Sequence, residues 1–260
     1  MKFAAALAGL AISVSSAALA DGLPDLGGKE IVIVTENAYP PLQFMADGKA
    51  IGWEYDAIAE LSKRMNFTVK YETTSWDAMI PAVSEGQFDM GMTGITITDE
   101  RKEKVDFSEP YMRSESVMMV RGDEVRFADA ATFGANAELL IGAQAGTTPF
   151  YTAVYSVLDG NEANPRIKLF ETFGASVEAL KAGDVDTVLT DSTAGKGYVD
   201  ASNGALKLVG EPLGTEDFGF IFPKGSEWVA PMNAGIAALK ADGTLDALNK
   251  TWFLDYKAGQ

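Results

Sequence analysis

The sequence predicts an α/β protein of two lobes, each built on a sheet that is flanked by helices. Strand-like and helix-like segments alternate along the chain, which is typical of βαβ units and parallel pairing. One helix–strand phrase occurs twice, at residues 79–94 and 176–191, and each copy ends in polar residues. Ligands bind beyond the carboxyl ends of the strands in open α/β sheets. We therefore expect two facing lobes with a ligand between them.

The first half of the chain supplies one such series of elements. The β-branched run at residues 30–35 predicts a strand, and the Pro40-Pro41 pair after it predicts an irregular loop. The elements expected next are a helix from Trp53, a strand at residues 67–71 and a helix over residues 76–83. The first copy of the repeated phrase then ends this half.

The second half restarts the pattern after a strand at residues 116–121. The elements expected in order are a strand at 141–144, a helix from Pro149, a strand at 168–172, a helix and a strand at 187–190. Two final helices, separated by Gly243, are too few for a domain, so we expect them to return to the first lobe. Extended crossings near 113–120 and 216–223 would link the lobes. No internal linker is rich in Gly and Ser, which predicts a stiff hinge.

The N-terminus has the pattern of a secretory signal peptide, residues 1–20. Lys2 is a short positive region, residues 3–10 begin an apolar region, and Ala18-Leu19-Ala20 is a cleavage site of small residues. A membrane span needs about 18 apolar residues, and serines interrupt this stretch. The chain has no cysteine to carry a lipid anchor after the signal. The expected location is the periplasm of a Gram-negative bacterium.

Composition excludes several classes of function. The 260 residues include no cysteine and no histidine, so disulfides, Cys-based metal sites and Ser-His or Cys-His catalysis are excluded. We expect no metal, no cofactor and no enzymatic activity. The formal net charge of −16 disfavours nucleic acid and anionic lipid as partners. A monomer without direct membrane insertion is expected.

The run WDAMIPAVSEGQFDMGMTGITITDERKEKVDFSEPYM, residues 76–112, is similar to the signature region of family 3 solute-binding proteins, the periplasmic polar amino acid receptors of ABC importers. The AYPPLQF, GTT and LTD segments extend the resemblance over the mature chain. The resemblance implies a type II periplasmic binding protein-like fold, with a mixed, mostly parallel sheet in each lobe and two hinge crossings. Lobe 1 would comprise residues 28–114 and 222–260, and lobe 2 residues 115–221. The implied ligand is a polar amino acid, neutral or basic, or a close derivative, and the implied partner is an inner-membrane ABC permease.

The resemblance also assigns the charged ends of the ligand. Arg101 would bind the α-carboxylate, because the planar guanidinium group can donate two hydrogen bonds to a planar carboxylate. The charged residues around it are also consistent with an ordinary exposed arginine on a helix. Asp191 would receive the α-ammonium group, or it could be the N-cap of the next helix. We expect Thr148 to be an N-cap with Pro149 at the first helical position. Free amides there and at Thr147 would bind a carboxylate.

The other assigned positions surround the ligand. Tyr39 and Trp76 match aromatic walls, although aromatic residues are more often core residues. Glu36 matches a residue at the far end of the ligand, where an acid would suit a cationic or amide tip, but a surface glutamate is also consistent with the sequence. The strand-end residues that would bind the charged head are Thr93, Gly94 and Thr96, and Gly94 replaces the serine of many relatives.

An enzyme on the same scaffold, such as a cyclohexadienyl dehydratase-like protein, is the alternative. That chemistry needs a general acid or base in the cleft. Without histidine, the role would fall to Glu36 or another carboxylate.

Overall fold

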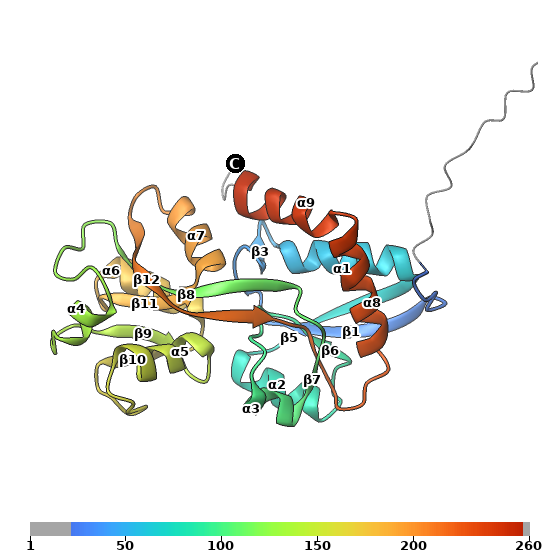
Figure 1. Ribbon diagram of the computed structural model, residues 1–260, viewed down its shortest axis with the longest axis horizontal. Helices are drawn as coiled ribbons and strands as arrows, with labels where there is room; N and C mark the ends of the chain where they lie inside the picture. Colours follow the sequence, from blue (N-terminus) through green and yellow to red (C-terminus); the bar gives the residue numbers. More distant parts are fainter. Residues whose placement is uncertain (1–21, 257–260) are drawn as a thin grey trace, which may run out of the picture.

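The computed structural model of the protein describes residues 22–256, so the expected signal peptide lies outside the described residues. The chain forms two lobes, each with a five-stranded sheet and helices packed on it (Figure 1). The predicted α/β class and two-lobed arrangement are confirmed.

The first sheet has the strand order β5-β1-β6-β13-β7. Its strands are β1 (Lys29–Thr35), β5 (Phe67–Thr73), β6 (Met90–Gly91), β7 (Asp106–Phe107) and β13 (Ile221–Phe222). The helices of this lobe are α1 (Trp53–Met65), α2 (Trp76–Ser84), α3 (Asp99–Lys104), α8 (Val229–Ala241) and α9 (Thr244–Lys250), and the π-helix Thr251–Asp255 follows α9.

A small third sheet forms where the proline pair predicted only an irregular loop. Its strands are β2 (Ala38–Tyr39), β3 (Gln43–Ala46) and β4 (Lys49–Ile51). The prediction was wrong there because prolines restrict only their own positions, and β2 and β3 pair on either side of them. The side-chain oxygen of Gln43 also accepts a hydrogen bond from the backbone N–H of Ala38, at 3.1 Å.

The second sheet has the order β10-β9-β11-β8-β12. Its strands are β8 (Met112–Arg121), β9 (Ile141–Gln144), β10 (Ile167–Phe170), β11 (Thr187–Asp191) and β12 (Leu206–Phe218). The helices are α4 (Ala130–Gly134), α5 (Thr148–Thr152) with the π-helix Ala153–Val157, α6 (Phe173–Ala182) and α7 (Ser192–Ala201). Each sheet is mixed, as predicted, but parallel pairs do not predominate. The strands β8 and β12, which run between the lobes, and β13, which follows the second crossing, pair antiparallel with their neighbours.

The repeated phrase makes the same turn in both lobes. Gly86 and Gly183 end α2 and α6 with φ angles of 74° and 87°, in the left-handed region that favours glycine. Three residues later, Asp89 accepts a hydrogen bond from the N–H of Val32 at 2.7 Å, and Asp186 accepts one from Leu140 at 2.8 Å. Each aspartate thus ties the new strand to the strand beside it in the sheet.

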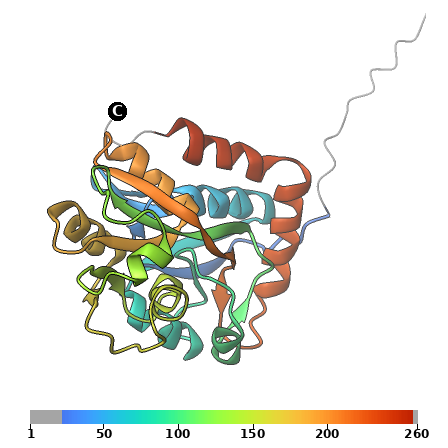
Figure 2. The ribbon, with the colours of Figure 1, turned by 60° about the vertical axis from the view of Figure 1, so that its left-hand side comes forward.

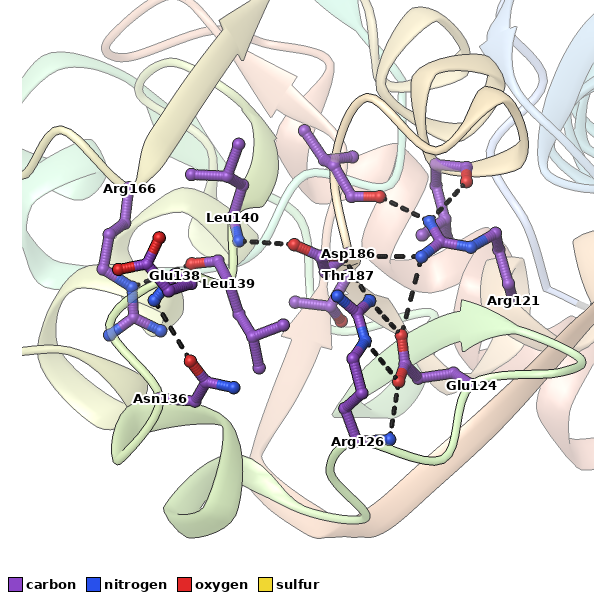
Figure 3. Close-up of polar contacts among 12 residues, drawn as sticks. Arg121, Glu124, Arg126, Asn136, Glu138, Leu139, Leu140, Arg166, Asp186 and Thr187 are labelled. Carbon is purple, nitrogen blue, oxygen red and sulfur yellow. Dashed lines mark hydrogen bonds and ion pairs between the residues drawn. The ribbon is translucent and has the colours of Figure 1, made fainter.

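Asp186 also belongs to an ion network on lobe 2 (Figure 3). Arg121 and Arg126 both pair with its carboxylate. Glu124, whose side chain is 2% exposed, accepts a hydrogen bond from Nε of Arg126 at 3.0 Å and pairs with Nη2. These bonds hold the pKa of Glu124 at about 2. The network joins the end of β8 to the start of β11.

Two segments connect the sheets. The chain passes from β7 to β8 and returns from β12 to β13, and β8 and β12 lie side by side between the lobes (Figure 1). The last helices lie on the first lobe, where α8 packs beside α1 (Figure 2). Met232, Ile236 and Leu239 of α8 belong to the same core as the buried residues of α1. Gly235 allows the close contact, because a Cβ there would lie 2.4 Å from Leu61.

Candidate functional site

A cavity lies between the two lobes, beyond the carboxyl ends of β1 and β6 on one side and β9 and β11 on the other. Every predicted site residue except Asp191 lines it: Glu36, Tyr39, Trp76, Thr93, Gly94, Thr96, Arg101, Thr147 and Thr148. The lining residues that sequence reasoning missed include Gln144, Phe173, Glu216 and Phe218. The cavity volume of about 50 Å³ has room for a few water molecules, so an amino acid can enter only if the lobes move apart.

Arg101 is a nearly buried cation at this cavity, with 8% of its surface exposed. Nη1 donates to the carbonyl of Thr96 at 2.9 Å and Nη2 to the carbonyl of Gly146 at 3.3 Å. The guanidinium lies over the ring of Trp76, 4.9 Å from its centroid. Burial lowers the pKa of Arg101 to about 10, so it stays charged at neutral pH.

The surroundings of Arg101 favour an anion. Within residues 22–256 no carboxylate lies at ion-pair distance from its guanidinium, whose protein acceptors there are carbonyl groups. The interpretation of Arg101 as an ordinary exposed helix residue is wrong, because the side chain is buried at the cavity. The charges of Glu216 and Glu100 act to raise the pKa of Arg101 without forming a direct ion pair, and a carboxylate ligand would supply a directly paired anion.

Asp191 lies behind the cavity wall, 1% exposed. It is the N-cap of α7, the alternative that the sequence left open: Oδ1 accepts from the N–H groups of Thr193 at 2.8 Å and Ala194 at 3.1 Å. The same oxygen accepts from Oγ of Ser114 at 3.0 Å, and Oδ2 accepts from the hydroxyl of Tyr39. Burial raises the pKa of Asp191, although these hydrogen bonds oppose the shift.

Glu216, on β12, is a second acidic residue of the cavity, beside Glu36, and lies at the junction of the lobes. It is 6% exposed. Oε2 accepts from the hydroxyl of Thr96 at 2.6 Å and Oε1 from the hydroxyl of Ser116 at 3.2 Å. Burial, reinforced by the charge of Asp191, raises its pKa to about 7. The sequence marked residues 216–223 as a crossing but offered no means to tell which acid on the strand faces inward.

The start of α5 differs from the prediction by one residue. Thr147 is the N-cap, because its hydroxyl oxygen accepts from the N–H of Phe150 at 3.2 Å. Thr148 is the first helical residue, and its hydroxyl donates across the cavity to that of Thr96 at 2.8 Å. The side chain assigned to capping is thus free to contact the other lobe.

Two further contacts join the lobes at the cavity. Nε2 of Gln144 donates to Oε1 of Glu36 at 2.8 Å, and burial raises the pKa of Glu36. The ring of Tyr39 packs edge-on against Phe173, with 5.2 Å between centroids. The lobes therefore meet directly, and this is a closed arrangement.

Gly94 is positioned by a buried acid of lobe 1. Its φ is 61°, and a Cβ would lie 2.9 Å from the side chain of Leu42, so a serine here would adopt a strained backbone and would require Leu42 to shift. The N–H of Gly94 donates to Oε1 of Glu54 at 2.9 Å, and Oε1 also accepts from the hydroxyl of Tyr111. The neighbouring hydroxyl of Thr93 accepts from Gln43 at 2.6 Å. The amide of Gly94 is thus occupied by Glu54 and is not available to a ligand in this arrangement.

No group of three or more acidic residues in residues 22–256 could hold a metal ion. None of the helices in that range has the length and apolar character needed to cross a bilayer.

Two sheets of the same strand order, closed on a small cavity with a buried arginine, define a two-lobed binding protein. Residues 31–255 match the model of the bacterial extracellular solute-binding proteins, family 3, so the chain belongs to that family.

Named proteins are similar to this chain in sequence or in structure. The L-cystine-binding protein TcyJ of Escherichia coli (strain K12) is 29% identical over 226 residues, which are 86% of this chain and 82% of the relative. A probable histidine-binding protein of Neisseria gonorrhoeae is 29% identical over 233 residues, 87% of this chain and 84% of that one. The arginine-, lysine-, histidine-binding protein ArtJ of Geobacillus stearothermophilus has a solved structure with a TM-score of 0.79 and 31% identity. The match covers 86% of this chain and 95% of ArtJ.

Proposed function

We propose that the protein is the substrate-binding component of an ABC importer, which closes on a polar amino acid and presents it to an inner-membrane permease. It acts as a monomer in the periplasm of a Gram-negative bacterium, after removal of residues 1–20. The observation that carries the proposal is Arg101, a nearly buried cation at an interlobe cavity, with no carboxylate partner within residues 22–256. The α-carboxylate of the ligand would pair with its guanidinium.

The remaining site residues act around that pair. Thr93, Gly94 and Thr96 bind the charged head from lobe 1, and Thr147 and Thr148 from lobe 2. The boundaries proposed for lobe 1 are residues 28–114 and 222–260, with residues 115–221 as lobe 2. Tyr39 and Trp76 form the walls, and only closure brings both halves to one ligand.

The charge of the cavity supports a neutral or basic ligand. Glu36 and Glu216 line it, and Arg101 is the basic residue among its lining residues. Once Arg101 is paired with the α-carboxylate, a second carboxylate on the ligand would lie near two acids without a cation. Histidine, arginine and lysine, which are named for two of the reported relatives, are consistent with this preference, whereas cystine, named for the third, carries a second carboxylate together with a second ammonium group. Those names all describe amino acid binding, which supports a binding protein over a dehydratase-like enzyme.

Ligand-induced thermal stabilisation tests the proposal. The mature protein is heated with each of the twenty amino acids, with opines and with polyamines. A ligand at a hundredfold excess over its Kd should stabilise the folded state by about 2.7 kcal/mol.

The variant Arg101→Ala should lose the shift, because it removes the cation that pairs with the carboxylate. Arg113→Ala, at a side chain that is 70% exposed, is the matched control and should keep it. The proposal fails if no compound stabilises the wild type, or if Arg101→Ala binds as tightly as the wild type.

A further inference from the structure

We propose that Glu54, a buried acid in the first turn of α1, is a positioning residue that couples the ligand site of lobe 1 to the two crossings between the lobes. It touches no ligand in this role. The inference rests on the proposed function and deepens it, because it names the contact through which binding at the cavity reaches the hinge.

One oxygen of Glu54 joins two parts of lobe 1. Oε1 accepts a hydrogen bond from the N–H of Gly94 at 2.9 Å and another from the hydroxyl of Tyr111. Gly94 lines the interlobe cavity. Tyr111 is the last residue before β8, the first of the crossing strands. A shift of the chain at Gly94 when a ligand binds is therefore passed to the start of this crossing through a single carboxyl oxygen.

Tyr111 is also tied to the second crossing. Its N–H donates to the carbonyl of Phe218, the last residue of β12, at 3.0 Å. Its ring stacks on Trp53 of α1 and on Phe220, which follows β12, with centroids 5.2 Å and 4.4 Å away. The two crossing strands lie side by side between the lobes (Figure 1). Tyr111 thus links both crossings to α1, and Glu54 fixes the position of its hydroxyl group.

The environment of Glu54 is unfavourable for an acid, so packing alone does not account for the residue. The side chain is 0% exposed, and Trp53 and Tyr111 beside it belong to the hydrophobic core of lobe 1. Oε2 has no hydrogen-bond partner within residues 22–256. A buried carboxyl group with an unpaired oxygen costs stability that an apolar side chain would not. Local arrangements that reduce stability are typical of functional positions.

A double-mutant cycle tests the coupling. Calorimetric titration uses each of the twenty amino acids, and the variants are compared for those that bind the wild type. Glu54→Gln keeps an oxygen for both donors, Glu54→Leu removes it, and Tyr111→Phe removes one donor. The fourth variant combines Glu54→Leu with Tyr111→Phe. Leu239→Ala, at a buried residue of α8 in the same core, is the control for lost stability.

Glu54→Leu should weaken binding at least about tenfold, whereas Glu54→Gln should stay within about threefold of the wild type. Tyr111→Phe should weaken binding about threefold. The double variant should be no more than about twofold weaker than Glu54→Leu, because both substitutions break the same link. Leu239→Ala should lower the thermal stability and leave the affinity within about twofold of the wild type.

Small-angle scattering measures the hinge directly. At saturating ligand, the radius of gyration should decrease less in Glu54→Leu than in Glu54→Gln, and equal decreases would overturn the inference. So would wild-type affinity in Glu54→Leu, an equal loss in Glu54→Gln or Leu239→Ala, or additive losses in the double variant. If Glu54→Leu does not fold, Tyr111→Phe decides, and wild-type affinity and compaction there would overturn the coupling. If the wild type binds no amino acid, the proposed function itself fails, whereas failure in the variants alone leaves that function intact.

Discussion

Glu54 makes the free energy of unfolding depend on pH, and substituting this one residue should remove its contribution to that dependence. The residue is fully buried in the first turn of α1. Oε1 accepts from Gly94 and Tyr111, whereas Oε2 has no hydrogen-bond partner within residues 22–256. Burial raises the pKa of Glu54 from 4.5 to about 7. The folded protein therefore holds this proton more tightly than the unfolded chain does.

The sign and size of the effect follow from this difference. Because the folded pKa is raised, the contribution to stability is fully present below pH 4.5 and is lost as the pH rises through about 7. At about 1.4 kcal/mol for each pH unit, the loss is about 3 kcal/mol. Glu54→Gln removes the titration and keeps an oxygen for Gly94 and Tyr111. The free energy of unfolding of this variant should therefore fall less steeply between pH 5 and pH 8.

Urea unfolding followed by circular dichroism at pH 5, 6, 7 and 8 measures the effect. Glu103→Gln, at an exposed position of α3, removes the same formal charge and is the control. The pKa of Glu216 is also raised, so this residue contributes to the pH dependence in the same direction. Glu54→Gln should therefore reduce the change of the free energy of unfolding with pH without abolishing it. A pH profile parallel to that of the wild type would refute the assignment of a neutral, buried Glu54.

Two further substitutions test the closure of the lobes and the ion network of lobe 2. A Cβ at Gly197 on α7 would lie 3.0 Å from Pro41 of lobe 1, so Gly197→Val should oppose closure and weaken ligand binding about tenfold in calorimetry. Gly174→Ala, where the nearest atom is 3.5 Å away, should not. Glu124→Gln should lower the free energy of unfolding at pH 7 by about 1–3 kcal/mol. This range lies below the value expected from the pKa shift alone, because Arg126 is half-exposed and water screens the ion pair. Because the folded pKa of Glu124 is depressed to about 2, its contribution is present above pH 4.5 and is lost as the pH falls through about 2. The difference from the wild type should therefore shrink in acid denaturation curves.

Local patterns were enough to predict most of the regular elements, although not the small sheet of β2, β3 and β4. The periodicity after Trp53 predicted a helix, and α1 runs from Trp53 to Met65. The repeated Gly-x-x-Asp phrase predicted two similar lobes, because glycine supplies the left-handed turn and the aspartate bonds to the neighbouring strand. These features depend on residues close in sequence. Predictions that required one-residue accuracy failed where two neighbours had the same chemistry, as with Thr147 and Thr148.

The residues of the site could be predicted only with the family motif, and their actual roles were decided by the tertiary structure. The charged residues around Arg101 in the sequence suggested an exposed helix, and its burial comes from contacts with Trp76 and Gly146. The sequence contains acids on many strands, and only the fold decides that Glu216 faces the cavity while Asp191 caps a helix behind it. Periodicity reports which face of an element is apolar. Which charged groups meet across two lobes, and which are left without a counterion, is set by packing between residues far apart in the chain.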